Sequence, residues 1–175
     1  MSTADALRRK LRERDGKAAR QDLLQRFGAL GGNAQAVSWV SLDESDSLVR
    51  RWGSVLGVPA GEQLTFRPPA SGQRTWTCAW TVRAEERPSA PPAYPAQSVP
   101  LPTSNASLFL LFGDYRSMGI ARSSPHLLTD FLEELALADG DGFMAVTESL
   151  DYVLQVDVEE NEGTMELELA VWGDG

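Results

Sequence analysis

Residues 152–172 read YVLQVDVEENEGTMELELAVW, with apolar and polar side chains alternating on both sides of a polar centre. Alternation with a period of two is typical of β-strands that bury one face. Joining the two runs through a five-residue turn predicts a hairpin with Val158 opposite Met165 and Asp157 opposite Glu166. In that register the apolar side chains of both strands share one side, and the acidic side chains share the other.

The polar side of this hairpin is rich in carboxylates. Like charges directly across a ladder, such as Asp157 and Glu166, destabilise it by roughly 0.2–1 kcal/mol. Two interpretations stay open. A negative face favours fast and specific association with a cationic partner, whereas a charged, solvated face also protects a sheet edge from aggregation. The residues expected to bind a partner are Asp157, Glu159, Glu160, Glu162, Glu166, Glu168 and Trp172.

Trp172 belongs to this set for a separate reason. In the expected register it lies on the acidic side, and an aromatic side chain inside a charged patch is typical of a binding hot spot.

Charge is segregated along the chain. No lysine or arginine follows Arg122, whereas fourteen acidic residues fall between Asp130 and Asp174. The first 26 residues hold eight basic and four acidic ones. With a net charge of −9, the chain should repel bulk nucleic acid and anionic membrane surfaces, so we expect a basic protein partner.

Helical periodicity predicts three helices around this hairpin. They cover residues 1–30, 43–56 and 124–139, each followed by glycine, and Asp15-Gly16 could divide the first in two. Strands are expected at 36–42, 64–66, 75–83, 107–112, 115–121, 143–147, 152–158 and 164–172. This order favours a single α+β domain with a largely antiparallel sheet and about three helices.

Residues 86–105 interrupt the pattern with six prolines. Such a composition predicts a long surface loop with extended, polyproline-like stretches. The single cysteine excludes an intramolecular disulfide, and the polar first 14 residues lack the apolar core of a signal peptide. We therefore expect a cytoplasmic protein.

Signals for catalysis and for metal binding are weak. His126, the only histidine, lies at an expected helix start, and Cys78 lies between two tryptophans in an expected strand. The sequence Asp139-Gly-Asp141 opens like a calcium loop, but the ligands and glycine that should follow are missing. We expect no catalytic residue, no metal and no cofactor.

The basic first helix has several possible partners. Nucleic acid or a membrane would suit a basic amphipathic helix, but its mixed charges favour a solvated helix or docking against the acidic C-terminal half. That docking could occur within one chain or in a homodimer.

Two segments resemble a known family. The stretch from Asp141 to Asp157, DGFMAVTESLDYVLQVD, followed by a hairpin and Trp172-Gly173, resembles immunity proteins of bacterial polymorphic-toxin systems, the YxiF-like ones in particular. The first helix, ending in LLQRF at residues 23–27, fits the same pattern. The resemblance implies a cytoplasmic, non-enzymatic protein that neutralises a toxin, often a nuclease. The alternative is a homo-oligomerising structural or adaptor module without a toxin partner.

Overall fold

The computed structural model describes residues 3–64, 76–83, 99–102, 106–161 and 164–173. For residues 3, 76–83, 160–161, 164–166 and 173 it describes the backbone alone.

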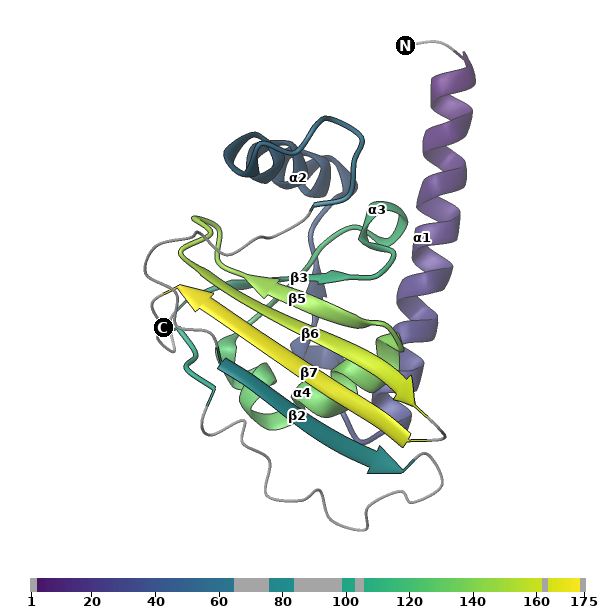
Figure 1. Cartoon of the computed structure of the whole chain (residues 1–175). Coiled ribbons are helices and arrows are strands. Elements are labelled where there is room, and N and C mark those ends of the chain that lie inside the picture. The colour runs from purple at the N-terminus through teal and green to yellow at the C-terminus, as the bar shows by residue number, and fades with distance from the viewer. Residues whose placement is uncertain (1–2, 65–75, 84–98, 103–105, 162–163, 174–175) are drawn as a thin grey trace.

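Within these residues the chain forms an α+β fold, as the sequence predicts, with four α-helices and seven strands (Figure 1). The helices are α1 (Thr3–Ala29), α2 (Leu42–Leu56), the single turn α3 (Tyr115–Met118) and α4 (Pro125–Asp139), with a 3₁₀ turn η1 at Ala34–Ala36. The strands are β1 (Ser38–Trp39), β2 (Trp76–Arg83), β3 (Leu108–Phe112), β4 (Ala121–Ser123), β5 (Gly142–Val146), β6 (Tyr152–Asn161) and β7 (Thr164–Gly173). They form one antiparallel sheet in the order β1-β4-β3-β5-β6-β7-β2.

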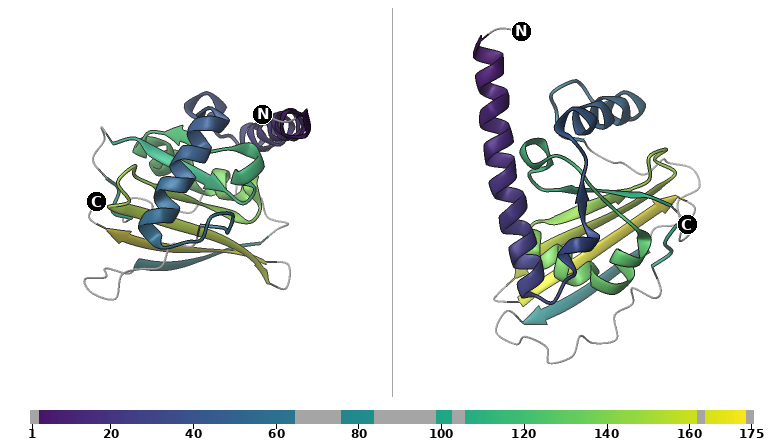
Figure 2. Two further views of the ribbon diagram at one scale, coloured as in Figure 1. Left: turned by 90° about the horizontal axis from the view of Figure 1, so that it is seen from above. Right: turned by 180° about the vertical axis from the view of Figure 1, so that it is seen from behind.

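The sheet carries a core on each of its two faces. Helices α1 and α4 cover one face. There Leu23 and Phe27 of α1 and Leu128 of α4 pack on Leu154 and on other sheet residues whose side chains point to the same side. Helix α2 covers the other face (Figure 2), with its buried Trp52 and Leu48 packed near Phe109 and Val153. The first core is the larger, and it holds the apolar side of the hairpin.

Local signals account for the two longer helices that follow α1. The Ser41 hydroxyl caps α2 by accepting a hydrogen bond from the Glu44 backbone N–H at 3.1 Å. Gly57 ends α2 in the left-handed conformation, at φ 69°. Pro125 begins α4 right after Ser124, where its missing N–H removes no helical hydrogen bond.

The register expected for the hairpin is wrong by two residues. Val158 pairs with Leu167, not Met165, and Asp157 pairs with Glu168, not Glu166. Pairing continues to Asn161 and Thr164, so two residues instead of five join the strands. A shorter connection lets ten residues of each strand join the ladder. Because side chains alternate with a period of two, a shift of two residues leaves every side chain on its expected face.

The segment expected as a strand at 115–121 is instead the turn α3 followed by β4. Buried Tyr115 and Met118 lie three residues apart, the spacing of a helical turn. Arginines of α1 bind the carbonyl oxygens that this turn leaves free: Arg12 donates to Arg116 and Arg20 donates to Met118. The strand therefore starts six residues later than expected.

Helix α1 runs unbroken through Gly16, so Asp15-Gly16 does not divide it. A Cβ atom at Gly16 would lie 2.2 Å from the Ser117 carbonyl oxygen, which shows how closely α1 and α3 approach. The strand expected at 36–42 is reduced to the two residues of β1, after η1.

Two other expectations fall largely outside the described residues. These are the strand at 64–66, of which Leu64 alone is described and is buried without being a strand, and the proline-rich loop at 86–105. Within that loop Val99 is buried and Leu101 packs against the larger core.

Candidate acidic binding face

Helix α2 covers only one end of its face of the sheet. Along β6, Val153 lies in the core beneath α2, and Gln155, Asp157 and Glu159 then follow on the same side at every second position. Along β7, Trp172 packs on that core, and Glu168 comes four residues before it on the same side. The face is therefore apolar under α2 and acidic beyond it.

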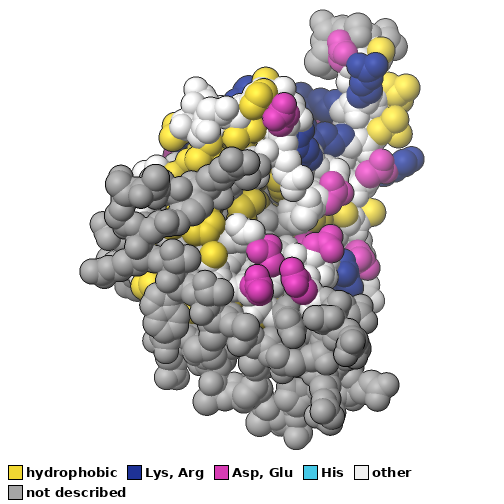
Figure 3. Space-filling model, in the orientation of Figure 1, with side chains coloured by type: hydrophobic (Ala, Val, Ile, Leu, Met, Phe, Trp, Pro, Cys, Tyr) yellow, Lys and Arg dark blue, Asp and Glu magenta, His cyan; other side chains and the backbone are white. Residues whose placement is uncertain are grey.

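The acidic face consists of the described carboxylates Asp141, Asp157, Glu159 and Glu168. Glu159 and Glu168 are exposed, and Asp157 is half-buried. Figure 3 looks onto this side of the sheet: acidic side chains gather over its middle strands, whereas the visible lysines and arginines lie along α1 and beside α2. No ion pair within the described part of the chain involves a carboxylate of this face.

Two like-charged positions pair across β6 and β7. Asp157 pairs with Glu168, and Glu159 pairs with Glu166. The expected register contained one such pair, and the observed register contains two in succession. On the other side of β6, Asp157 pairs with Gly142, which has no side chain to screen it. Negative charge therefore accumulates at these positions, and no described side chain forms an ion pair with it; the backbone register places Arg83 of β2 on the same side of the sheet, opposite Thr164.

Asp157 is held in place by its strand neighbour. The Gln155 side-chain amide donates a hydrogen bond to Oδ2 of Asp157 at 2.7 Å. Burial raises the pKa of Asp157, the Gln155 hydrogen bond lowers it, and the nearby charge of Glu159 raises it; the net direction is upward. Asp157 is thus a fixed carboxyl group whose charge a cationic ligand would stabilise.

Asp139 and Asp141 bring carboxylates from another part of the chain to the same region. A Cβ atom at Gly113 would lie 3.5 Å from Oδ2 of each, so the end of β3 and the α4–β5 connection converge. The Gly113 N–H donates to Oδ2 of Asp139 at 3.2 Å. Burial is the main cause that raises the pKa of Asp139 to about 6. The Gly113 hydrogen bond and the charge of Arg26 on α1 oppose this rise, and the charges of Asp141 and Asp114 add to it. In sequence this segment opens like a calcium loop, and Asp141 was not expected in the binding face.

A groove of about 380 Å³ opens beside Asp141 and Asp157. Its apolar lining includes Leu111 and Met144, and its polar lining includes Gln155 and both aspartates. On the far side the Tyr115 hydroxyl accepts a hydrogen bond from the Leu64 N–H at 3.0 Å, which fixes that wall. The groove can hold an extended side chain with an apolar stem and a cationic end.

The other expected site residues are distributed differently. Glu160 pairs with Met165, a strand position that alternates onto the side opposite Asp157, and Glu166 is placed by its backbone pairing alone. Glu162 lies outside the described residues. Trp172 has the expected alternation and pairs with Val153, but its side chain is half-buried against the core beneath α2. Trp172 therefore borders the core and is not a fully exposed aromatic residue.

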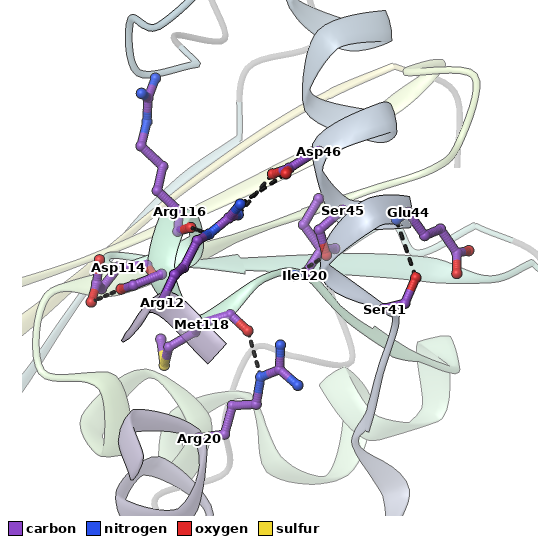
Figure 4. Close-up of polar contacts among 11 residues, drawn as sticks. Arg12, Arg20, Ser41, Glu44, Ser45, Asp46, Asp114, Arg116, Met118 and Ile120 are labelled. Carbon is purple, nitrogen blue, oxygen red and sulfur yellow. Dashed lines mark hydrogen bonds and ion pairs between the residues drawn. The ribbon is translucent and has the colours of Figure 1, made fainter. Parts of the chain in front are cut away.

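The arginines of α1 are engaged elsewhere (Figure 4). Arg12 binds both carboxylate oxygens of Asp46 on α2, at 2.7 and 2.8 Å, and also donates to the Arg116 carbonyl oxygen at 2.7 Å. Arg9 pairs with Asp43 at 2.9 Å. Arg20 donates to the Met118 carbonyl oxygen and stacks over Trp39, 5.0 Å from its ring centroid. Arg9, Arg12 and Arg20 bind α2 and α3, so none of these three arginines pairs with a carboxylate of the acidic face.

Comparisons of the chain with models of protein families, with curated proteins and with solved structures found no match. No described helix is both long and apolar enough to cross a membrane. Among the described residues, no three His, Cys, Asp or Glu side chains are arranged to hold a metal ion.

Proposed function

We propose that this chain is a non-enzymatic binding protein whose acidic face binds a basic protein. The observation that carries the proposal is the pairing of Asp157 with Glu168 on the part of the sheet that α2 leaves uncovered. Like charges across a ladder lower stability, and a cationic partner turns that penalty into attraction. A role in complex formation explains why these positions are acidic although no described side chain forms an ion pair with them.

The most specific form of the proposal is an immunity or inhibitor protein that acts in the cytoplasm on a basic toxin such as a nuclease. A nuclease binds the phosphate backbone with lysines and arginines, so its substrate cleft is positively charged. A fixed row of carboxylates matches that cleft and excludes the nucleic acid. The resemblance of residues 141–157 to YxiF-like immunity proteins supports the same form.

The groove supplies specificity beyond net charge. A lysine or arginine of the partner would lay its methylene stem against Met144 and place its charged end between Asp141 and Asp157. An arginine can bind two carboxylates at once because its guanidinium group is planar and has several donors. We expect such an anchor at the centre of the complex and Glu159 and Glu168 at its rim.

The test uses the toxin-like protein encoded next to this chain, titrated calorimetrically against the wild type and two variants. The triple variant Asp157→Asn, Glu159→Gln, Glu168→Gln should bind at least about tenfold more weakly and show a smaller dependence on salt. Asp130→Asn, an exposed carboxylate on α4, removes one charge from the other side of the sheet and should bind like the wild type. Equal affinity and equal salt dependence of the triple variant and the wild type would refute the proposal.

A further inference from the structure

Helix α1 has a face that contacts the rest of the chain and a face that does not. On the first face Gly16, Leu23 and Phe27 are buried. Its first turns extend past the body of the molecule (Figures 1 and 2). There Leu7 is 59% exposed and Leu11 is 41% exposed, which is unusual for two leucines four residues apart on one helix.

The two leucines point away from the body because of the helical period. At 100° per residue, Leu7 lies about 180° around α1 from Gly16, and Leu11 is within about 40° of Leu7. The ion pairs of Arg9 with Asp43 and of Arg12 with Asp46 fix this rotation, since both arginines are on the side that faces α2. Helix α1 therefore cannot turn its leucines toward its own sheet.

The exposed face of α1 is also basic. Arg8, Lys10 and Lys17 are exposed beside the leucines. An apolar pair with basic neighbours is complementary to the acidic face, which offers the apolar surface of the groove next to Asp141 and Asp157. The two surfaces lie on one chain, and each lacks a partner within the described part of that chain.

We infer that the first turns of α1 dock on the acidic face of a second copy of this chain. Leu7 and Leu11 cover the groove beside Met144, and Arg8 and Lys10 approach the carboxylates at its edge. A stable interface buries about 1,600 Å² in total. The first turns of one helix docked on one sheet cover less area than that. A twofold arrangement in which each copy docks its α1 on the other doubles the area and closes the assembly.

This association uses the same face as the proposed toxin partner. The dimer would keep the carboxylates covered until a partner with more positive charge displaces α1, so binding of the partner should dissociate the dimer. Self-association does not require that such a partner exists, and the two can be tested separately.

The experiment is sedimentation velocity on the full chain at low and at high salt. The wild type should dimerise at low salt and dissociate at high salt, because screening weakens contacts between exposed charges. Reversing the helix charge with Arg8→Glu and Lys10→Glu, or the sheet charge with Glu159→Lys and Glu168→Lys, should weaken the dimer by about tenfold or more. Mixing the two variants makes both contacts of the twofold arrangement complementary in charge, because each helix then meets a sheet of opposite sign, and should give a heterodimer. Circular dichroism checks that each variant is folded.

Three results of the sedimentation experiments would overturn the inference. They are a wild type that is monomeric at every salt concentration, a dimer that both charge reversals leave intact, and a mixture that gains no heterodimer. Binding of monomeric wild type to vesicles of anionic lipid, lost in Arg8→Glu and Lys10→Glu, would assign the exposed helix to a membrane surface and also overturn it. The variant Leu7→Ser, Leu11→Ser separates the two proposals: it should lose self-association and keep affinity for a basic partner.

Discussion

Asp157 of β6 lies directly opposite Glu168 of β7, so two carboxylates face each other across one rung of the sheet. Their strands continue on the same side to Val153 and Trp172, which pair beneath α2. One hairpin thus provides a core to the fold at one end and a negative surface at the other. The following predictions test this division and the contacts that hold the uncovered surface in place.

Removing one charge of the cross-strand pair should stabilise the protein. Glu168→Gln keeps the shape of the side chain and removes the repulsion with Asp157, so the free energy of unfolding should rise by roughly 0.2–1 kcal/mol. Urea denaturation at low salt measures the change. The gain in the free energy of unfolding should shrink at high salt, where the repulsion is screened.

The matched control is Asp130→Asn, an exposed carboxylate on α4. It should change stability little. If Glu168→Gln lowers the free energy of unfolding at low salt, the like charges do not oppose folding in the way described.

Asp139 should make stability depend on pH. Its pKa in the folded chain is about 6, above the ordinary value of 3.8, so the folded state binds a proton more tightly than the unfolded state. The free energy of unfolding should therefore fall as the pH rises from about 4 to about 6.

Asp139→Asn keeps a carbonyl oxygen for the Gly113 N–H and carries no charge. At pH 8 it should exceed the wild type in stability by about 1 kcal/mol, allowing for partial solvent exposure. The gain should vanish near pH 4. Chemical denaturation at both pH values measures it, and an equal gain at both would rule out ionisation as the cause.

Gly16 should resist substitution by alanine. The new Cβ would lie 2.2 Å from the Ser117 carbonyl oxygen, so α1 and α3 must separate. We expect Gly16→Ala to lower the free energy of unfolding by about 2 kcal/mol. Gly28→Ala, in the same helix with open space around it, should raise it by about 0.5 kcal/mol. Thermal melts of both variants check the contrast; similar shifts would show that α1 does not touch α3.

Arg12 and Asp46 should be energetically coupled. A double-mutant cycle with alanine at each position should give about 1 kcal/mol at neutral pH, since the contact is bidentate and partly buried. The Arg12 contact lowers the pKa of Asp46, so the coupling is present above the ordinary carboxyl pKa and lost as the pH falls below it. The exposed pair Arg26 and Asp22 should give only about 0.3–0.5 kcal/mol. Equal coupling in both cycles would contradict the special role of Arg12.

Much of the fold could be predicted because its signals are local. The proline at the start of α4 and the alternation of β6 and β7 each involve neighbouring residues. The Ser41 cap of α2 is also local, but it was missed because Ser41 fell inside the strand expected at 36–42. The turn at Tyr115 could not be predicted in this way. Its hydrogen bonds come from Arg12 and Arg20, about 100 residues away in the chain, and no local pattern contains that information.

The candidate site was predicted in part. Asp157 and Glu168 lie on the expected side because alternation fixes the face of a strand residue whatever its partner. Glu159, expected in the turn, joins the same side because β6 continues to Asn161. Their pairing depended on the length of the turn, and the expected five-residue turn placed Glu166 where Glu168 lies. Asp141 was missed because it reaches the groove through the pairing of β5 with β6.

The sequence by itself determined the α+β class, the alternation of the hairpin and the segregation of charge, since each follows from the order and spacing of residues. Tertiary structure alone decided which carboxylates share a surface and which leucines face outward. Helix α1 places its arginines against α2 and its leucines in solvent because one rotation about its axis satisfies the buried Gly16 contact and both ion pairs. That choice depends on distances between segments far apart in the chain, which a linear pattern does not contain.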